Sequence, residues 1–289
     1  MGEPPELRRP TRRQAYRRRL VALVLVLAVV GASAWAAVAM VGSSDKAPPE
    51  PTTTVAAPKV LRVLFPEGFT RAQMAARAHR VSPAIGVSQY LKATASSNLP
   101  GKFAVDGKRR SLEGFLFPAT YDVYDNSPAG VLVRKQLDAF SENWAKVDLR
   151  YARSKNLTPY DVLTIASMIE KEVVVPKERP LVAAVIYNRL HARMSLGIDA
   201  TLRYGLGIPP TKAISKTDLA SDSPYNTRKF PGLPPTPIAN PGLASIQAAA
   251  HPAKVDYLYF VRSPDCRSHF FTASIEEFDS YTRKGLTNC

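Results

Sequence analysis

Cysteine and histidine are scarce in this sequence. Among 289 residues there are two cysteines, Cys266 and Cys289, and four scattered histidines. Neither a CxxC pair nor an HExxH sequence occurs. Zinc sites in proteins need such ligands at close spacing, so the sequence predicts no metal, and we expect no cofactor.

Acidic residues are also in short supply. Twenty-four Asp and Glu residues face 39 Lys and Arg residues, which gives a formal net charge of +15. A basic surface favours an anionic partner, such as nucleic acid, lipid headgroups or an acidic polymer outside the cell. No predicted helix interleaves basic with aromatic residues, so we expect no nucleic-acid partner.

Part of the positive charge is concentrated at the N-terminus. Residues 1–19 hold seven arginines and two glutamates, and residues 20–41 then carry no charge at all. At about 1.5 Å per residue, the uncharged run would span ~33 Å as a helix, enough to cross a bilayer core of ~30 Å. Arginine before the span predicts a cytoplasmic tail, a single transmembrane helix and an extracellular remainder at the cell membrane.

A cleaved signal peptide is the alternative, because "GASAWA" offers small residues at which cleavage could occur. The apolar run continues well past a usual signal core, which favours the retained anchor. In either case the body of the chain is exported. There the two cysteines could form a disulfide; unpaired thiols or a bond to another chain are the alternatives.

Residues 42–59 are rich in Pro, Thr and Ser and predict an extended linker. Beyond them the pattern is α+β. A strand at 60–65 and two short helices after Thr70 and Pro83 predict a small subdomain over 60–110. Residues 111–289 predict a mainly helical domain with a short β-sheet.

The helical domain begins with a buried strand or loop at 112–123. Helical patterns follow in segments that start near Ser127, Thr158, Pro176, Gly242 and Ser274, and two strands are expected at 257–261 and 269–273. Short turns and a proline-rich loop, "FPGLPPTPIANPG", fill 197–242. We find no internal repeat.

The helix that begins after Thr158 ends in an unusual way. Thr158 can cap it together with Asp161, with Pro159 in its first turn. On a helical wheel Thr164, Ser167 and Lys171 form the polar face, whereas Glu170 and Glu172 fall at the two edges of the apolar stripe.

A carboxylate among apolar side chains loses hydration, which raises its pKa and lets it act as a general acid. The alternative is a solvated pair, or one bridged to Arg179 or Arg189. The wheel does not choose between Glu170 and Glu172.

Several stretches, in order, resemble one family: "PEGFT", "LEGFLFPATY", "ASMIEKE", "VIYNRL", "YNT", "GLPPTPIANPG", "SIQAAAHPA" and "YLYFV". The chain from Val60 to Gly285 is similar to the MltG-like (YceG-like) endolytic lytic transglycosylases of bacterial cell walls. In the segment "GIDATLRYGLG", Asp199 and Thr201 match the family pattern, and Ala200 stands in the position of a proline.

The resemblance implies that Glu170 is the catalytic residue and that residues 60–110 form a LysM-like module. It implies cleavage of peptidoglycan glycan strands between N-acetylmuramic acid and N-acetylglucosamine, with a 1,6-anhydro-muramyl end as product. It also implies a role in ending the growth of nascent strands, and the membrane anchor suggests proximity to glycan-polymerising synthases.

Five further residues are candidates for holding the sugar. Asn188 and Arg189 offer donors on the next helix, and Tyr225, Asn226 and Thr227 form a polar loop cluster. Their structural alternatives are an ion pair of Arg189 with Glu172 and ordinary turn chemistry for the loop cluster. Glu178 is expected to be a solvated residue at a helix start.

Three other functions compete with the transglycosylase. A non-catalytic peptidoglycan-binding scaffold would keep the grooves without needing a proton donor. A hydrolase with the same cleavage site would give reducing ends. A nucleic-acid binder is suggested by net charge alone.

Overall fold

The computed structural model describes residues 57–95, 101–103 and 109–284. Nearer the N-terminus it describes only a few helical residues, namely Tyr16, Val21, Val24, Leu27, Ala28 and Gly31. The predicted tail, transmembrane helix and linker therefore lie almost wholly outside the described residues. Within the described ranges, no helix is both long and apolar enough to cross a membrane.

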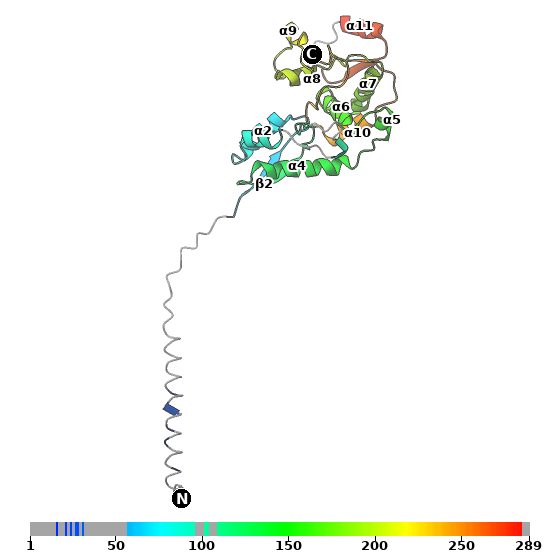
Figure 1. Ribbon diagram of the computed structural model, residues 1–289. Helices are drawn as coiled ribbons and strands as arrows, with labels where there is room; N and C mark the ends of the chain where they lie inside the picture. The colour runs from blue at the N-terminus through cyan, green and yellow to red at the C-terminus, as the bar shows by residue number, and fades with distance from the viewer. Residues whose placement is uncertain are drawn as a thin grey trace, which may run out of the picture. The chain divides into compact units, whose positions relative to one another are not determined.

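The chain divides into two compact units, Met1–Ala57 and Pro58–Cys289. The second unit has an α+β fold that opens with a two-stranded antiparallel sheet (Figure 1). Strand β1 (Val60–Leu64) pairs with β2 (Thr120–Tyr124), so that Val60 lies opposite Tyr124. The predicted boundary at residue 110 thus falls between two paired strands.

Two short helices lie between these strands in the sequence, α2 (Arg71–Val81) and α3 (Val87–Ala93). Thr70 caps α2 through a reciprocal pair of hydrogen bonds with Gln73, which confirms the predicted helix start. A 3₁₀ turn, η1 (Gly101–Phe103), follows α3.

The remaining elements are mainly helices. They are α4 (Ala129–Trp144), α5 (Arg150–Ser154), α6 (Pro159–Glu172), η2 (Pro176–Glu178), α7 (Arg179–His191), α8 (Asp199–Leu206), α9 (Lys216–Leu219), α10 (Leu243–Ala250) and α11 (Ile275–Arg283), with strands β3 (Tyr259–Arg262) and β4 (His269–Thr272) before α11. Helices α6, α7 and α10 pack on one another, and Figure 1 shows α6 and α10 together in the middle of the unit.

The longer predicted helices and both predicted C-terminal strands are confirmed, whereas α8 and α9 lie where turns were expected and α5 lies where no element was predicted. These three helices have only five, eight and four residues, too few to show a helical period in the sequence. Local capping defines them instead. Ser215 caps α9 together with Asp218, and Gly207 ends α8 in the left-handed conformation, with φ 66°.

An aromatic cluster fills the core between α4 and α6. Its members are buried and pack edge-to-face, tilted or stacked. Ring centroids are 4.8–6.3 Å apart for the contacting pairs among Phe103, Phe115, Phe140, Trp144 and Tyr160. Such pairs add to the stabilisation from burial alone. The cluster fixes the segment that carries Phe115 against α6.

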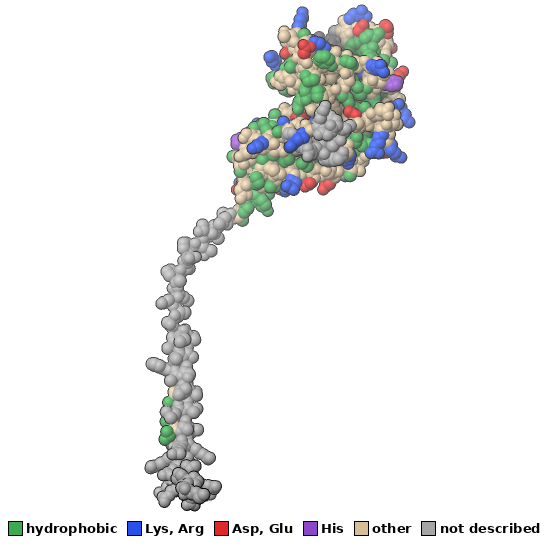
Figure 2. Space-filling model, in the orientation of Figure 1, with side chains coloured by type: hydrophobic (Ala, Val, Ile, Leu, Met, Phe, Trp, Pro, Cys, Tyr) green, Lys and Arg blue, Asp and Glu red, His purple; other side chains and the backbone are tan. Residues whose placement is uncertain are grey.

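Positive charge is distributed widely over the second unit. On the face drawn in Figure 2, Lys and Arg side chains appear at many separate places and are not gathered into one stripe. Nucleic-acid recognition would need basic residues clustered on one face or along one helix.

The C-terminal hairpin is joined to the helical body through Glu178. This residue is 4% exposed, so the expectation that it is solvated is wrong. Its carboxyl oxygens accept hydrogen bonds from the His269 backbone N–H at 3.0 Å and lie 2.7 Å from His269 Nδ1. Cys266, in the turn of the hairpin, is disulfide-bonded; Cys289 lies outside the described residues.

We expect Glu178→Ala to lower the free energy of unfolding by about 3 kcal/mol, because it leaves the buried His269 donors without partners. Urea denaturation followed by circular dichroism measures the change. The exposed neighbour Lys177 supplies the control, Lys177→Ala, which should stay within about 0.5 kcal/mol of wild type. Equal stability of Glu178→Ala and the control would contradict the assignment.

Candidate active site

Helix α6 runs through the core, and Glu170 lies near its C-terminal end, at the edge of the core. Thr158 accepts a hydrogen bond from Asp161 N–H and Asp161 caps Thr158 in return, with Pro159 in the first turn, as predicted. Every residue from Val162 to Ile169 is buried. Glu170 is the first half-buried position after this run.

The predicted polar face of α6 is not exposed along its length. Thr164 and Ser167 are buried, and their hydroxyl groups donate to carbonyl oxygens one turn earlier on the helix. Ser167 Oγ also accepts a hydrogen bond from Ile238 N–H at 3.0 Å. A loop therefore covers the face that the wheel left to solvent.

The same loop contacts Glu170. Gly242 N–H donates to Glu170 Oε2 at 3.1 Å, and Gly68 also packs against the Glu170 side chain. A Cβ atom on Gly68 would lie 3.5 Å from Glu170 Cγ, and Gly68 has φ +76°, which favours glycine. Among the described residues, the second carboxyl oxygen of Glu170 accepts no hydrogen bond. It is thus the oxygen available to a ligand.

Glu67 is a second carboxylate at this place, and the sequence did not single it out. An ideal Cβ atom on Gly242 would be 1.8 Å from Glu67 Oε1, so the Glu67 carboxyl lies directly against Gly242. Glu67 is exposed overall, but its carboxyl is partly shielded from water by the surrounding protein. This loss of hydration raises the pKa of the Glu67 carboxyl. The negative charge of Glu170 raises that pKa further, and the Arg179 guanidinium opposes the rise.

Behind the loop lies a third carboxylate, Glu113, which is 2% exposed. It accepts hydrogen bonds from Arg71 N–H at 3.0 Å, Asn240 Nδ2 at 2.8 Å and Tyr204 O–H at 3.1 Å. Loss of water nevertheless outweighs these bonds and raises the pKa of Glu113 to about 7.

Asn240 connects this buried group to the loop around Glu170. Its side chain accepts from Leu116 N–H at 2.9 Å and donates to Phe69 O, while its own carbonyl oxygen accepts from Gly68 N–H at 2.9 Å. Asn240 is fully buried, so each of these bonds has a structural effect.

Glu172 faces a different part of the protein. Its carboxyl is turned inward, where loss of water and the negative charge of Asp199 raise its pKa to about 7. The nearby Arg262, a hydrogen bond from Ala200 N–H and the charge of Arg228 oppose this rise. Glu170 and Glu172 therefore lie in different surroundings, in line with their positions at the two edges of the apolar stripe on the helical wheel.

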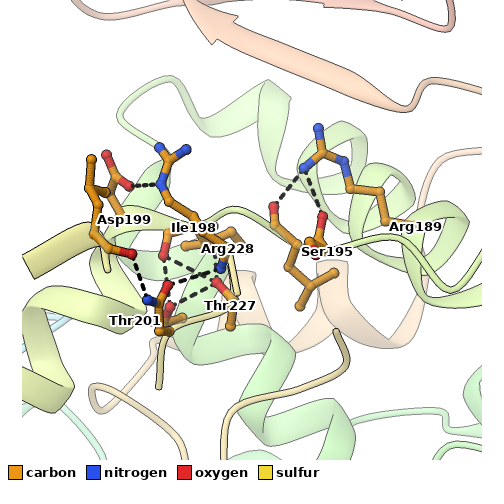
Figure 3. Close-up of polar contacts among 10 residues, drawn as sticks. Arg189, Ser195, Ile198, Asp199, Thr201, Thr227 and Arg228 are labelled. Carbon is orange, nitrogen blue, oxygen red and sulfur yellow. Dashed lines mark hydrogen bonds and ion pairs between the residues drawn. The ribbon is translucent and has the colours of Figure 1, made fainter. Parts of the chain in front are cut away.

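Asn188 and Arg189 mainly hold segments that follow them in the chain. Asn188 Nδ2 donates to Val255 O at 3.0 Å and to Tyr257 O at 2.9 Å. The Arg189 guanidinium donates to three carbonyl oxygens, those of Leu258, Ser195 and Leu196, and lies over the Tyr259 ring. Two of these bonds appear in Figure 3. Within the described ranges, no ion pair joins Arg189 to Glu172.

The Tyr225–Thr227 cluster also forms contacts within the protein. Asn226 is buried and donates to the carbonyl oxygens of Leu219, at the end of α9, and of Ser221. Thr227 Oγ1 accepts from Ile198 N–H at 3.1 Å and lies 2.9 Å from Thr201 Oγ1 (Figure 3). Tyr225 is half-buried, and its hydroxyl lies 2.8 Å from Thr236 Oγ1 in the proline-rich loop.

Two surface cavities have linings that do not include Glu170. One, of about 560 Å³, includes Tyr151, Tyr187 and Asn188 in its lining. The other, of about 450 Å³, is lined by Arg179 and by α10 residues that follow Gly242. Within the described part of the chain, no group of three or more His, Cys, Asp or Glu side chains could hold a metal ion.

Sequence reasoning missed Glu67, Glu113, Asn240 and Gly242 as members of this arrangement. Three of them lie in the stretches "PEGFT" and "GLPPTPIANPG", and Glu113 lies in "LEGFLFPATY"; these stretches carried the family resemblance but gave no role for the four residues. An acidic residue beside a glycine in two separate turns was the available signal. It could not show that both turns meet α6.

Comparison with known proteins gives a family match and several relatives. Residues 33–284 match the model of the YceG-like family. Two curated relatives named endolytic murein transglycosylase are each 36% identical, one from Bacillus subtilis over 180 residues and one from Streptococcus pneumoniae over 179. The aligned parts cover 62% and 60% of this chain.

The chain spans about half of the first relative (49%) and about a third of the second (32%). The crystal structure of a yceG-like protein from Listeria monocytogenes has a similar fold, with a TM-score of 0.67 and 33% identity. The match covers 76% of this chain and 75% of that one.

We expect Glu113→Gln to change how stability depends on pH. A carboxyl whose pKa is raised to about 7 in the fold binds its proton more tightly than in the unfolded chain. Its contribution is complete below the unfolded pKa, near 4.5, and is lost as pH rises through about 7. Glutamine can keep the hydrogen bonds from Arg71 and Asn240 and donate to the Tyr204 oxygen.

Glu113→Gln should therefore gain stability relative to wild type between pH 5 and pH 8, by at most about 3 kcal/mol. Urea denaturation at several pH values measures the difference. A difference that does not change with pH would show that Glu113 is ionised throughout this range.

Proposed function

Because the chain belongs to the YceG-like family, we propose that it is a lytic transglycosylase that cleaves the glycan strands of peptidoglycan. The relatives named endolytic murein transglycosylase support this reaction. The proposed cut is internal, between N-acetylmuramic acid and N-acetylglucosamine, and leaves a 1,6-anhydro-muramyl end. Cutting nascent strands in this way would end their elongation.

The observation that carries the proposal is the position of Glu170. It stands where a buried helix reaches the surface, with one carboxyl oxygen held by Gly242 N–H and the other available. A general acid must reach the atom that it protonates and must keep a fixed orientation. The hydrogen bond from Gly242 supplies that orientation.

The proposed reaction needs one proton donor. Neutral Glu170 gives its proton to the glycosidic oxygen as the bond to the muramyl anomeric carbon breaks. The C6 hydroxyl of the same sugar attacks that carbon, and ionised Glu170 takes up the hydroxyl proton. The substrate provides the nucleophile, so the second carboxylate that ordinary glycosidases use to attack or to activate water is not needed for bond formation.

The five candidate sugar-binding residues have a mixed role in this proposal. Asn188, Arg189, Asn226 and Thr227 use their side-chain hydrogen bonds to hold loops, so we propose that they shape the walls of the glycan groove. Tyr225 is half-buried beside Tyr204, with ring centroids 5.3 Å apart, and is the one most able to meet a sugar face.

We expect Glu170→Gln to keep the fold and glycan binding but to lower strand cleavage at least a hundredfold, because glutamine cannot donate a proton to the leaving oxygen. Mass spectrometry of digested glycan strands counts anhydro-muramyl ends. Glu172→Gln is the matched control on the same helix and should cleave at nearly the wild-type rate.

Each rival has its own result in this assay. Reducing ends from wild-type protein would identify a hydrolase. Binding without any cleavage would identify a scaffold. Wild-type cleavage by Glu170→Gln would remove Glu170 from the mechanism.

We also propose that residues 20–41 anchor the protein in the cell membrane as a single span, with the N-terminus in the cytoplasm and the catalytic part outside. The support is the 22-residue uncharged run and the arginines before it. Such an anchor would hold the site near membrane enzymes that polymerise glycan.

The full chain should therefore stay with membranes in alkaline carbonate, and a chain that begins at residue 42 should be released. Immunoblotting of the two fractions tests the anchor. Release of the full chain would support a cleaved signal peptide or a peripheral association.

A further inference from the structure

Glu67 and Glu170 are far apart in the sequence, but both of their carboxyl groups contact Gly242. Gly242 N–H donates to Glu170 at 3.1 Å, and the Glu67 carboxyl occupies the space that a side chain on Gly242 would need. The two carboxylates are therefore close neighbours across one glycine. Glu67 is also exposed, so a ligand that reaches Glu170 from solvent meets both.

The turn that carries Glu67 is fixed to both neighbouring elements. Gly68 N–H donates to Asn240 O at 2.9 Å, and Asn240 N–H donates to Phe69 O at 2.9 Å. Lys171 on α6 donates to Gly68 O at 3.3 Å. This turn is therefore held in place on two sides, as a residue with a precise role requires.

We propose that Glu67 is a second catalytic residue of this site, whose ionised carboxylate stabilises the positive charge that develops on the muramyl ring. The inference rests on the proposed function, because that charge arises only when a glycosidic bond breaks beside Glu170. The glycosidic oxygen receives its proton from Glu170, and the C6 oxygen forms the new bond to the anomeric carbon. Glu67 forms no bond and exchanges no proton.

Cations near the Glu67 carboxyl oppose its protonation. Burial and the negative charge of Glu170 raise the pKa of Glu67, and the Arg179 guanidinium, which also donates to Ser245 on α10 at 3.1 Å, opposes that rise. When Glu170 carries the proton that it donates, its repulsion of the Glu67 carboxylate is absent. Lys171 on α6 adds a second cation beside the Glu67 turn, and the N-terminus of α10 favours negative charge close to Gly242. Glu170 is the only other carboxylate in contact with Gly242 among the described residues. Neighbouring carboxyl groups in unlike environments commonly divide acid and charge-stabilising roles.

The test compares wild type, Glu67→Gln and a control, Glu142→Gln, at an exposed position on α4. The rate of anhydro-end formation is measured from pH 4 to pH 8, with circular dichroism and glycan binding as checks. Loss of the charge should lower the rate at neutral pH about tenfold to a hundredfold, with binding unchanged. The control should cleave like wild type.

The pH profile distinguishes a charge effect from a structural one. In wild type, activity should fall as pH drops through the raised pKa of Glu67, because protonation removes the stabilising charge. Glutamine does not titrate, so the residual activity of Glu67→Gln should lack this acidic decline.

A second variant moves the carboxylate without removing it. Gly242→Ala puts a methyl group where the Glu67 carboxyl lies, while the backbone angles of Gly242, φ −76° and ψ 168°, suit alanine and keep the N–H for Glu170. We expect a loss of rate similar to that of Glu67→Gln. Gly130→Ala on α4, with no atom near the added methyl group, is its control.

The experiment distinguishes failure of the proposed transglycosylase function from failure of the proposed role of Glu67. If wild type forms no anhydro ends, the proposed function fails. If wild type cleaves and Glu67→Gln stays within twofold of it, the inference about Glu67 is overturned. An acidic decline that persists in Glu67→Gln, or a loss confined to glycan binding, would overturn it as well.

Discussion

The site depends on how one loop is fastened to one buried helix. Ser167 and Glu170 are three residues apart on α6 and so lie on the same face. The first accepts Ile238 N–H at 3.0 Å and the second accepts Gly242 N–H at 3.1 Å. The pitch of the helix sets the distance between these two acceptors. It therefore also sets the distance that the loop must span from Ile238 to Gly242.

Other features of the unit follow from that fastening. Between its two attachment points the loop presents Asn240, whose side chain and backbone bind the Glu67 turn, the Leu116 segment and the buried Glu113. Four prolines between residues 234 and 241 restrict the loop further and reduce the freedom that it loses on folding. Because Gly242 has no side chain, two carboxylates can approach a single backbone position.

The sequence allowed the regular elements to be predicted wherever a pattern was long enough. The cap of α6 and the edge position of Glu170 followed from Thr158, Asp161 and helical spacing. The groups that surround Glu170 and Glu172 could not be predicted, because they belong to the loop at 238–242 and to α8, neither of which has a periodic pattern. The buried state of Glu178 was missed for a similar reason, since its partner His269 is 91 residues away.

The contact between the Glu67 turn and α6 has a consequence for how such chains can change over evolution. The turn immediately follows β1, near the start of the folded unit, whereas Glu170 and Gly242 come more than a hundred residues later. If recombination replaced the segment that contains β1 and the Glu67 turn, the residues that contact Glu170 would change as well. The N-terminal segment and the helical body are therefore bound to diverge together, even though each has its own secondary structure.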